Sequence, residues 1–197
     1  MSGDQRVARG ARSRRTITRH AVDVASVEGL SGLSFGRLAT DLGLSKGGVA
    51  TLFPTKEQLQ VATAETAGEL FLEAVVEPAS SEPPGAARLR ALLDRWIAYA
   101  EAPLFPGGCF WAASLPDFDS RPGPVRDLLA RQRRAWLALL AEQVSRAGAA
   151  GEIAELDPGL AAFQLDALLN AANLAMRLGE PDVAARVRRA IDGLLAA

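Results

Sequence analysis

The chain has 197 residues, of which 49% are hydrophobic, and its formal net charge is −1 at pH 7. This length allows one large or two small domains, with ample apolar residues for a core. One cysteine excludes an intrachain disulfide framework, and one histidine excludes a histidine-rich metal site and leaves no convincing Ser-His-acid set. No apolar stretch approaches the ~18–20 residues of a transmembrane helix, and the N-terminus lacks a signal peptide's apolar core. We therefore expect a soluble, cytoplasmic protein that has no membrane contact, needs no cofactor and is not an enzyme.

The charges are distributed unevenly along the chain. Residues 1–56 carry nine Lys or Arg against four acids, a net charge of +5, whereas residues 57–197 carry thirteen against nineteen, a net charge of −6. A basic module joined to an acidic body is typical of a protein that touches nucleic acid with one end only. Residues 1–15 are expected to form a flexible basic arm, which is either a solvated tail or a phosphate or minor-groove contact. Its basic residues are Arg6, Arg9, Arg12, Arg14 and Arg15.

Two short helices are predicted over 35–42 and 45–53, after a first helix over 16–28. Their apolar faces contain Leu38, Ala39, Leu42, Val49, Leu52 and Phe53. Gly43 suits the left-handed backbone that ends a helix, and Ser45 is the expected N-cap of the next one. This pattern predicts a helix-turn-helix, which places its second helix in the DNA major groove.

The rest of the chain also predicts helices, and no period-2 run bounded by turns is present, so the expected fold class is all-α. Thr55 and Gln58 form a capping box, and Asp157 with Pro158 is a good helix start. The expected helices cover 56–77, 86–102, 125–147, 157–178 and 182–195. The first of these is expected to bury Val61, Ala64, Gly68, Phe71, Leu72 and Val75. The segment 103–124, with five prolines, is expected to be irregular.

Two stretches carry a resemblance to a known family. The run from Ser45-Lys46-Gly47-Gly48-Val49 through Phe53 and then Lys56-Glu57-Gln58-Leu59 resembles the DNA-binding domain of TetR family transcriptional regulators, over roughly 17–64. The run from Gly107 to Arg126 resembles the C-terminal half of one subgroup of that family. The resemblance implies an N-terminal basic arm and helix-turn-helix DNA-binding domain over 1–56. It also implies a larger helical ligand-binding and dimerisation domain over 57–197.

This resemblance implies a ligand-responsive repressor that binds a palindromic double-stranded DNA operator as a dimer. Lys46, Lys56, Arg37 and the free amides at helix N-termini are expected to contact DNA. The full set of expected DNA-binding residues is Ser34, Arg37, Ser45, Lys46, Gly47, Gly48, Ala50, Thr51, Thr55 and Lys56. Ala50, Thr51 and Leu52 stand where the family usually has aromatic residues and a histidine. An alternative therefore stays open, a small-molecule-binding or interaction protein whose DNA head has lost sequence readout.

Aromatic residues gather in the C-terminal body, where they either pack the core or line a cavity for an apolar or amphipathic effector. The candidate ligand-binding residues are Trp96, Tyr99, Phe110, Trp111, Trp136, Phe163, Asn170 and Asn173. Cys109 lies in an apolar, aromatic segment, which favours a buried, inert thiol over a redox sensor.

The helices over 157–178 and 182–195 are expected to form the dimer interface. The first is apolar over most of its circumference and must be covered on more than one side. The second places Val183, Val187, Ala190, Ile191 and Leu194 on one seam. Two such helices from each of two chains would form a four-helix interface. The alternative is that both helices close the core of a monomer.

Overall fold

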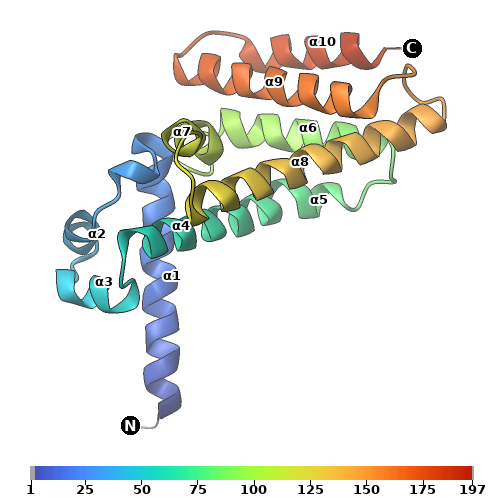
Figure 1. Ribbon diagram of the computed structural model, residues 1–197. Helices are drawn as coiled ribbons and strands as arrows, with labels where there is room; N and C mark the ends of the chain where they lie inside the picture. The colour runs from blue at the N-terminus through green and yellow to red at the C-terminus, as the bar shows by residue number, and fades with distance from the viewer. Residues whose placement is uncertain (1–2, 197) are drawn as a thin grey trace. The chain divides into compact units, whose positions relative to one another are not determined.

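The computed structural model of the chain describes residues 3–196, and all regular structure in that range is helical (Figure 1), so the all-α prediction is confirmed. The elements are α1 (Gly3–Glu28), η1 (Leu30–Gly32), α2 (Phe35–Leu42), α3 (Lys46–Leu52), α4 (Lys56–Phe71), η2 (Leu72–Val76), α5 (Glu77–Ala79), α6 (Ala86–Glu101), α7 (Phe110–Phe118), α8 (Pro124–Ala149), α9 (Pro158–Arg177) and α10 (Val183–Leu195). Within the described helices, none is long and apolar enough to cross a membrane.

The chain forms two compact units. The first unit consists of Met1–Glu69 and Phe105–Leu129, and the second consists of Leu70–Leu104 and Ala130–Ala197. This division differs from the expected boundary after Lys56, because residues 105–129 group with the N-terminal helices.

The first unit contains the predicted helix-turn-helix. Helix α1 packs against α2, α3, η1 and α7, and Ile17, Leu38, Val49 and Phe53 are fully buried. Gly43 ends α2 in the left-handed region, with a φ of 64°. Its αL conformation closes the helix and turns the chain into α3.

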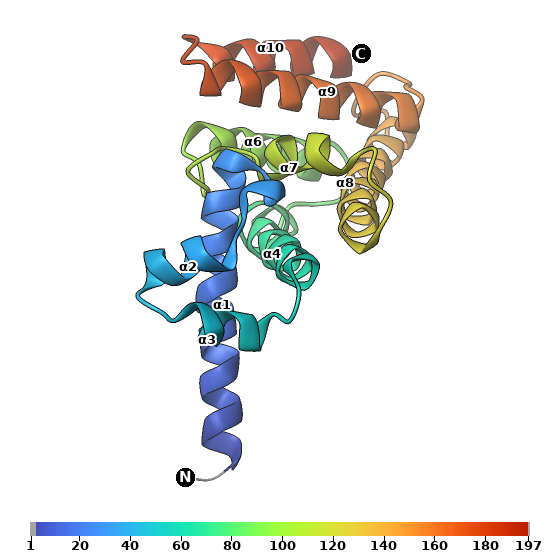
Figure 2. The same ribbon diagram turned by 60° about the vertical axis from the view of Figure 1, so that its left-hand side comes forward.

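The expected flexible arm over 1–15 is wrong from Gly3 onward, because these residues belong to α1. Residues 16–28 are anchored by buried side chains such as Ile17 and Ala21. Once residues 16–28 are helical, extending the helix at its N-terminal end costs little free energy, because nucleation is the unfavourable step in helix formation. In Figure 2 the N-terminal half of α1 extends beyond α2 and α3.

The segment 103–124 is also more ordered than expected, because it contains α7 with Pro116 inside the helix. Phe110, Ser114 and Phe118, at helical spacing of four, are buried on one face of α7. The burial of that face outweighs the hydrogen bond that proline cannot make. The proline count alone was therefore a misleading signal.

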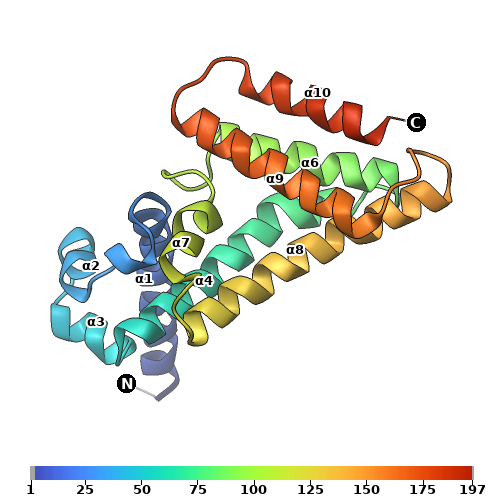
Figure 3. The ribbon, with the colours of Figure 1, turned by 45° about the horizontal axis from the view of Figure 1, so that its top comes forward.

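In the second unit, α6 packs against η2, α5 and α9, and α9 packs along α10 (Figure 3). Helix α6 buries Leu89, Leu92, Leu93, Trp96 and Tyr99 against these elements. Leu72, expected to be buried, is instead 49% exposed. It starts the π-helical turn η2, whose i→i+5 bonds change the register of the buried face after Phe71.

Candidate DNA-binding surface and effector site

Three helix N-termini in the first unit are capped by hydroxyl side chains, and two of these caps, Ser45 and Thr55, are the predicted ones. The Ser34 hydroxyl accepts a hydrogen bond from the Arg37 amide (3.2 Å), and the Ser45 hydroxyl accepts one from the Gly48 amide (3.0 Å). The Thr55 hydroxyl accepts one from the Gln58 amide (3.1 Å). These caps fix the first turns of α2, α3 and α4, whose remaining free amides suit phosphate oxygens.

Helix α3 presents a small and polar exposed face. Lys46, Gly47, Gly48 and Thr51 are exposed, and Ala50 is half-buried. The Thr51 hydroxyl donates to the Gly47 carbonyl (2.8 Å), so its methyl group is the part that remains for an outside contact. No hydrogen bond or ion pair within residues 3–196 ties down the Lys46 side chain. Lys46 is thus a long cationic donor available on this face.

Arg37, an expected DNA contact, is engaged inside the protein. Its Nη1 donates to both carboxylate oxygens of Glu28, and its Nε lies 3.5 Å from Asp41. The bond to Glu28 raises the pKa of the Arg37 guanidinium above its ordinary value. His20 Nε2 lies 2.9 Å from Asp41 Oδ2, and this hydrogen bond lowers the pKa of the Asp41 carboxyl. Arg37 would have to leave Glu28 before it could read a base.

Lys56 is also tied to the protein. Its Nζ donates to the Ser31 carbonyl (2.7 Å), and Gln60 Nε2 donates to the Leu30 carbonyl (2.9 Å). From the end of α7, the Asp117 carboxylate accepts from the Ser31 amide (3.2 Å). Lys56 therefore braces the η1 turn that precedes α2, a role that no local sequence signal indicated.

The second unit brings together three of the expected ligand-binding residues. The Phe71 ring lies edge-on to Tyr99 (5.6 Å between centroids) and to Trp136 (5.5 Å), and Trp96 lies against Tyr99 (6.0 Å). Within the described residues, the buried Trp136 Nε1 has no hydrogen-bond partner. A buried indole N–H without an acceptor is a costly arrangement that a bound acceptor would relieve. Phe71 was missing from the expected set.

The other expected residues lie elsewhere. Phe110 and Trp111 belong to the first unit, where their rings are 5.5 Å apart. Phe163 is 58% exposed on α9. Asn170 is exposed and donates to the Asp166 carbonyl (2.8 Å), whereas Asn173 is buried.

An ion pair between α8 and α9, in which only the carboxylate is buried, was not expected. Arg133 Nη2 lies 2.8 Å from Asp166 Oδ2, and the Asp166 side chain is only 10% exposed.

We expect Arg133→Met to lower the free energy of unfolding by about 1–3 kcal/mol, because it leaves a buried carboxylate unpaired while the arginine itself is partly solvated. Arg133→Lys, which keeps the charge, should lose less. Urea unfolding of both variants tests this, and an unchanged midpoint for Arg133→Met would contradict it.

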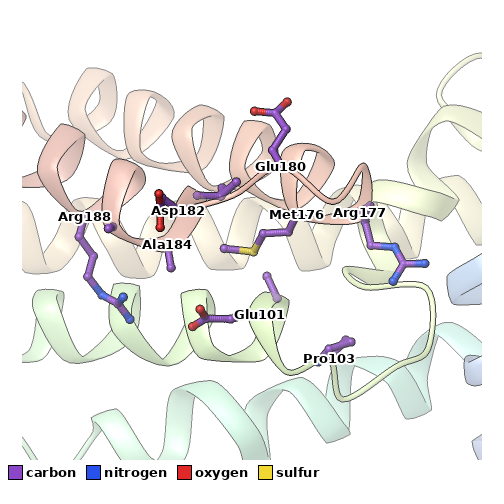
Figure 4. A pocket seen from close by; sticks show the side chains of 11 residues that line it. Glu101, Pro103, Met176, Arg177, Glu180, Asp182, Ala184 and Arg188 are labelled. Carbon is purple, nitrogen blue, oxygen red and sulfur yellow. The ribbon is translucent and has the colours of Figure 1, made fainter.

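A groove of about 490 Å³ opens where α6 ends and α9 turns into α10 (Figure 4). Its lining is mostly charged or small, and it includes none of the expected ligand-binding residues. The charged side chains around it are Glu101, Arg177, Glu180, Asp182 and Arg188. This lining does not suit an apolar effector.

Nothing in residues 3–196 is arranged as a metal site, since no three His, Cys, Asp or Glu side chains cluster there. Cys109 is 4% exposed, as expected for an inert thiol.

Comparison with known proteins supports the same reading. A family model described as "Tetracyclin repressor-like, C-terminal domain" matches residues 85–191. AibR, solved in complex with isovaleryl coenzyme A and operator DNA, is similar with a TM-score of 0.75 and 21% identity, covering 92% of this chain and 97% of AibR. A TetR transcriptional regulator from Chloroflexus aurantiacus is similar with a TM-score of 0.82 and 25% identity, covering 95% and 94% of the two chains. A TetR family regulator from Agrobacterium tumefaciens has a TM-score of 0.83 and 17% identity, with coverage of 94% and 99%.

No curated protein matches the chain. The match to the family model covers more than half of the sequence, and the similar structures extend over nearly all of it. The chain therefore belongs to the TetR family, whose members are DNA-binding transcriptional regulators and not enzymes.

Proposed function

We propose that the protein is a repressor that binds a palindromic operator as a homodimer and is released by a small apolar or amphipathic effector. In this proposal residues 1–56 bind DNA, and residues 57–197 bind the effector and the second copy. The observation that carries the proposal is the exposed face of α3, held by a capped N-terminus and the buried Val49 and Phe53. The net charge of +5 on residues 1–56 supports the same role.

The exposed side of α9 supports dimerisation. One side of the helix is buried within the chain, through Ala161, Leu165 and Leu169. The opposite side carries large apolar residues that remain open to solvent, and these are Leu160 (57% exposed), Phe163 (58%), Leu174 (61%) and, just past the helix end, Leu178 (72%). We name this set the α9 stripe. An apolar stripe of this length on a regulator with a symmetric DNA site fits a second copy of the chain.

The aromatic cluster of the second unit is the proposed effector site. Phe71, Trp96 and Tyr99 would contact the apolar part of the effector, and the Trp136 N–H would donate to a carbonyl or carboxylate oxygen. The AibR complex, in which a similar structure holds an acyl thioester and operator DNA, supports an effector of this amphipathic class. Binding that favours one conformation of the dimer would weaken operator binding, and linkage makes the two effects reciprocal.

A gel-shift assay with DNA from upstream of the protein's own gene tests the proposal. We expect the protein to shift one upstream duplex at concentrations at which a scrambled duplex of equal length stays unbound. The bound segment should contain a palindrome. Equal binding to both duplexes would instead favour the alternative, a small-molecule-binding protein without sequence readout.

Lys46→Ala is expected to weaken binding to operator and scrambled DNA alike. The slope of log K against log salt should fall by about 0.9, because one phosphate contact is lost. Lys56→Ala is the matched control, because the Lys56 ammonium already binds the Ser31 carbonyl. Its salt slope should stay close to that of the parent. A changed salt slope in Lys56→Ala and an unchanged one in Lys46→Ala would show that Lys56, and not Lys46, contacts phosphate.

A further inference from the structure

Arg14, in the N-terminal half of α1, contacts the C-terminal end of α3. Its Nη1 donates to the Leu52 carbonyl (3.0 Å), across 38 residues of sequence. Its guanidinium carbon also lies 4.5 Å from the centroid of the Phe53 ring. Leu52 is the last residue of α3, and Phe53, its C-cap, is fully buried. One side chain therefore both bonds to the end of this helix and covers its buried anchor.

Physical chemistry explains why this end needs support. The last carbonyls of a helix have no partner within it and carry a partial negative charge, which a cation stabilises. Helix α3 has only seven residues, too few to be stable by itself. Its N-terminus is fixed by the Ser45 cap, and its C-terminus is fixed by Arg14 and the burial of Phe53. The planar guanidinium can stack on a ring and donate a hydrogen bond in the same pose, which an ammonium does less well.

We propose that Arg14 is a positioning residue, which holds α3 in the orientation that operator recognition requires and does not itself bind DNA. This inference rests on the proposed function. It separates Arg14 from its neighbours Arg12 and Arg15, whose side chains are exposed and form no hydrogen bond or ion pair within the described residues. Those two arginines remain free for phosphate contacts.

The first test needs no DNA. Amide hydrogen exchange of the full-length protein is compared for the parent, Arg14→Ala and the matched control Arg15→Ala. We expect the peptide covering residues 45–53 to exchange at least 5-fold faster in Arg14→Ala, with peptides of the second unit unchanged, whereas Arg15→Ala follows the parent. Unchanged exchange over 45–53 in Arg14→Ala would overturn the proposal, whether or not the protein binds an operator.

The second test measures binding to operator and scrambled duplexes at several salt concentrations. Arg14→Ala should bind the operator about 10-fold more weakly and the scrambled duplex within about 2-fold of the parent, with an unchanged salt slope. Arg15→Ala should weaken both duplexes equally and lower the slope by about 0.9. If Arg14→Ala gives that second pattern, Arg14 is a phosphate contact and the proposal is wrong.

Arg14→Lys covers the case in which the alanine variant unfolds the first unit. It keeps the charge but not the combined stack and bond, so a lost operator preference with an unchanged salt slope supports positioning. A parent-like preference of Arg14→Lys for the operator overturns the proposal that Arg14 positions α3. Failure of the parent to distinguish the two duplexes would refute the proposed function, while the exchange experiment would still decide whether Arg14 holds α3.

Discussion

Replacement of Gly107 by alanine is expected to disrupt the first unit. A Cβ at this position would lie 1.9 Å from the carbonyl oxygen of Ser26 and 2.1 Å from its carbonyl carbon. Both atoms belong to the backbone of α1, so no side-chain rotation can make room. The Gly107 amide also donates to the Ser26 hydroxyl (2.9 Å), and this bond would break when the segments separate. Overpacking of a tight contact costs about 1–3 kcal/mol and more where the backbone must move.

Urea unfolding monitored by circular dichroism measures this effect. The matched control is Gly10→Ala on α1, the helix that Gly107 contacts, because an added Cβ at Gly10 meets nothing within 4 Å. That change should stabilise the protein slightly, by up to about 1 kcal/mol, since alanine is the better helix former. If Gly107→Ala unfolds at the same denaturant concentration as the parent, Gly107 does not lie as close to the α1 backbone as the structure shows.

The location of Gly107 bears on the proposed release of DNA by an effector. The segment Phe105–Leu129 falls within the match to the family's C-terminal domain, yet it belongs to the same unit as the helix-turn-helix. Gly107 contacts the last turns of α1, and Asp117 binds the Ser31 amide next to η1. Movement of this segment would therefore act directly on the elements that carry α2 and α3.

Local signals in the sequence were reliable where both partners lie within one helical turn. Ser34, Ser45 and Asp157 cap their helices with bonds to amides three residues later, and Gly43 adopts the expected left-handed conformation. These features depend on neighbouring residues only, so residue type and spacing suffice to predict them.

Interactions between distant residues could not be predicted in the same way. Arg37 and Lys56 suit phosphate contacts by chemistry, but folding brings Glu28 and the Ser31 carbonyl to them. The ion pair between Arg133 and Asp166 joins two helices across 33 residues. A single sequence specifies such pairs only through the tertiary packing, for which it carries no local pattern.

The apolar seam expected on α10 is a second case in which the sequence does not indicate the packing partner. Val187 and Ile191 are 5% and 4% exposed within a single chain, so they pack the protein's own core, whereas Ala190 is exposed. Amphipathic spacing indicates that a face is buried, but not whether it is buried by the same chain or by a second copy. The high exposure of the α9 stripe in the single chain is the observation on which we propose it as the interface.

Leu174→Asp is therefore expected to give a folded monomer with weak operator binding. Leu174 is 61% exposed in the single chain, so the carboxylate stays solvated and folding is retained. In a two-fold symmetric interface the same change occurs in both copies and buries charge without a partner, at a cost of about 3–5 kcal/mol. This cost corresponds to at least a ~100-fold weaker dimer, and the monomer can occupy only one half-site of a palindrome.

Sedimentation velocity and gel shift on the same preparations measure both effects, with two control variants. Leu72→Asp changes another exposed leucine of the second unit, 49% exposed and outside the α9 stripe, and should remain dimeric with parent-like operator binding. Val187→Asp places the charge in the core of the chain itself, so it should unfold the protein rather than dissociate a dimer. A dimeric Leu174→Asp with unchanged operator affinity would exclude the α9 stripe as the interface. A folded monomer with weakened operator binding would show that binding depends on this contact, because the DNA-binding residues themselves are untouched.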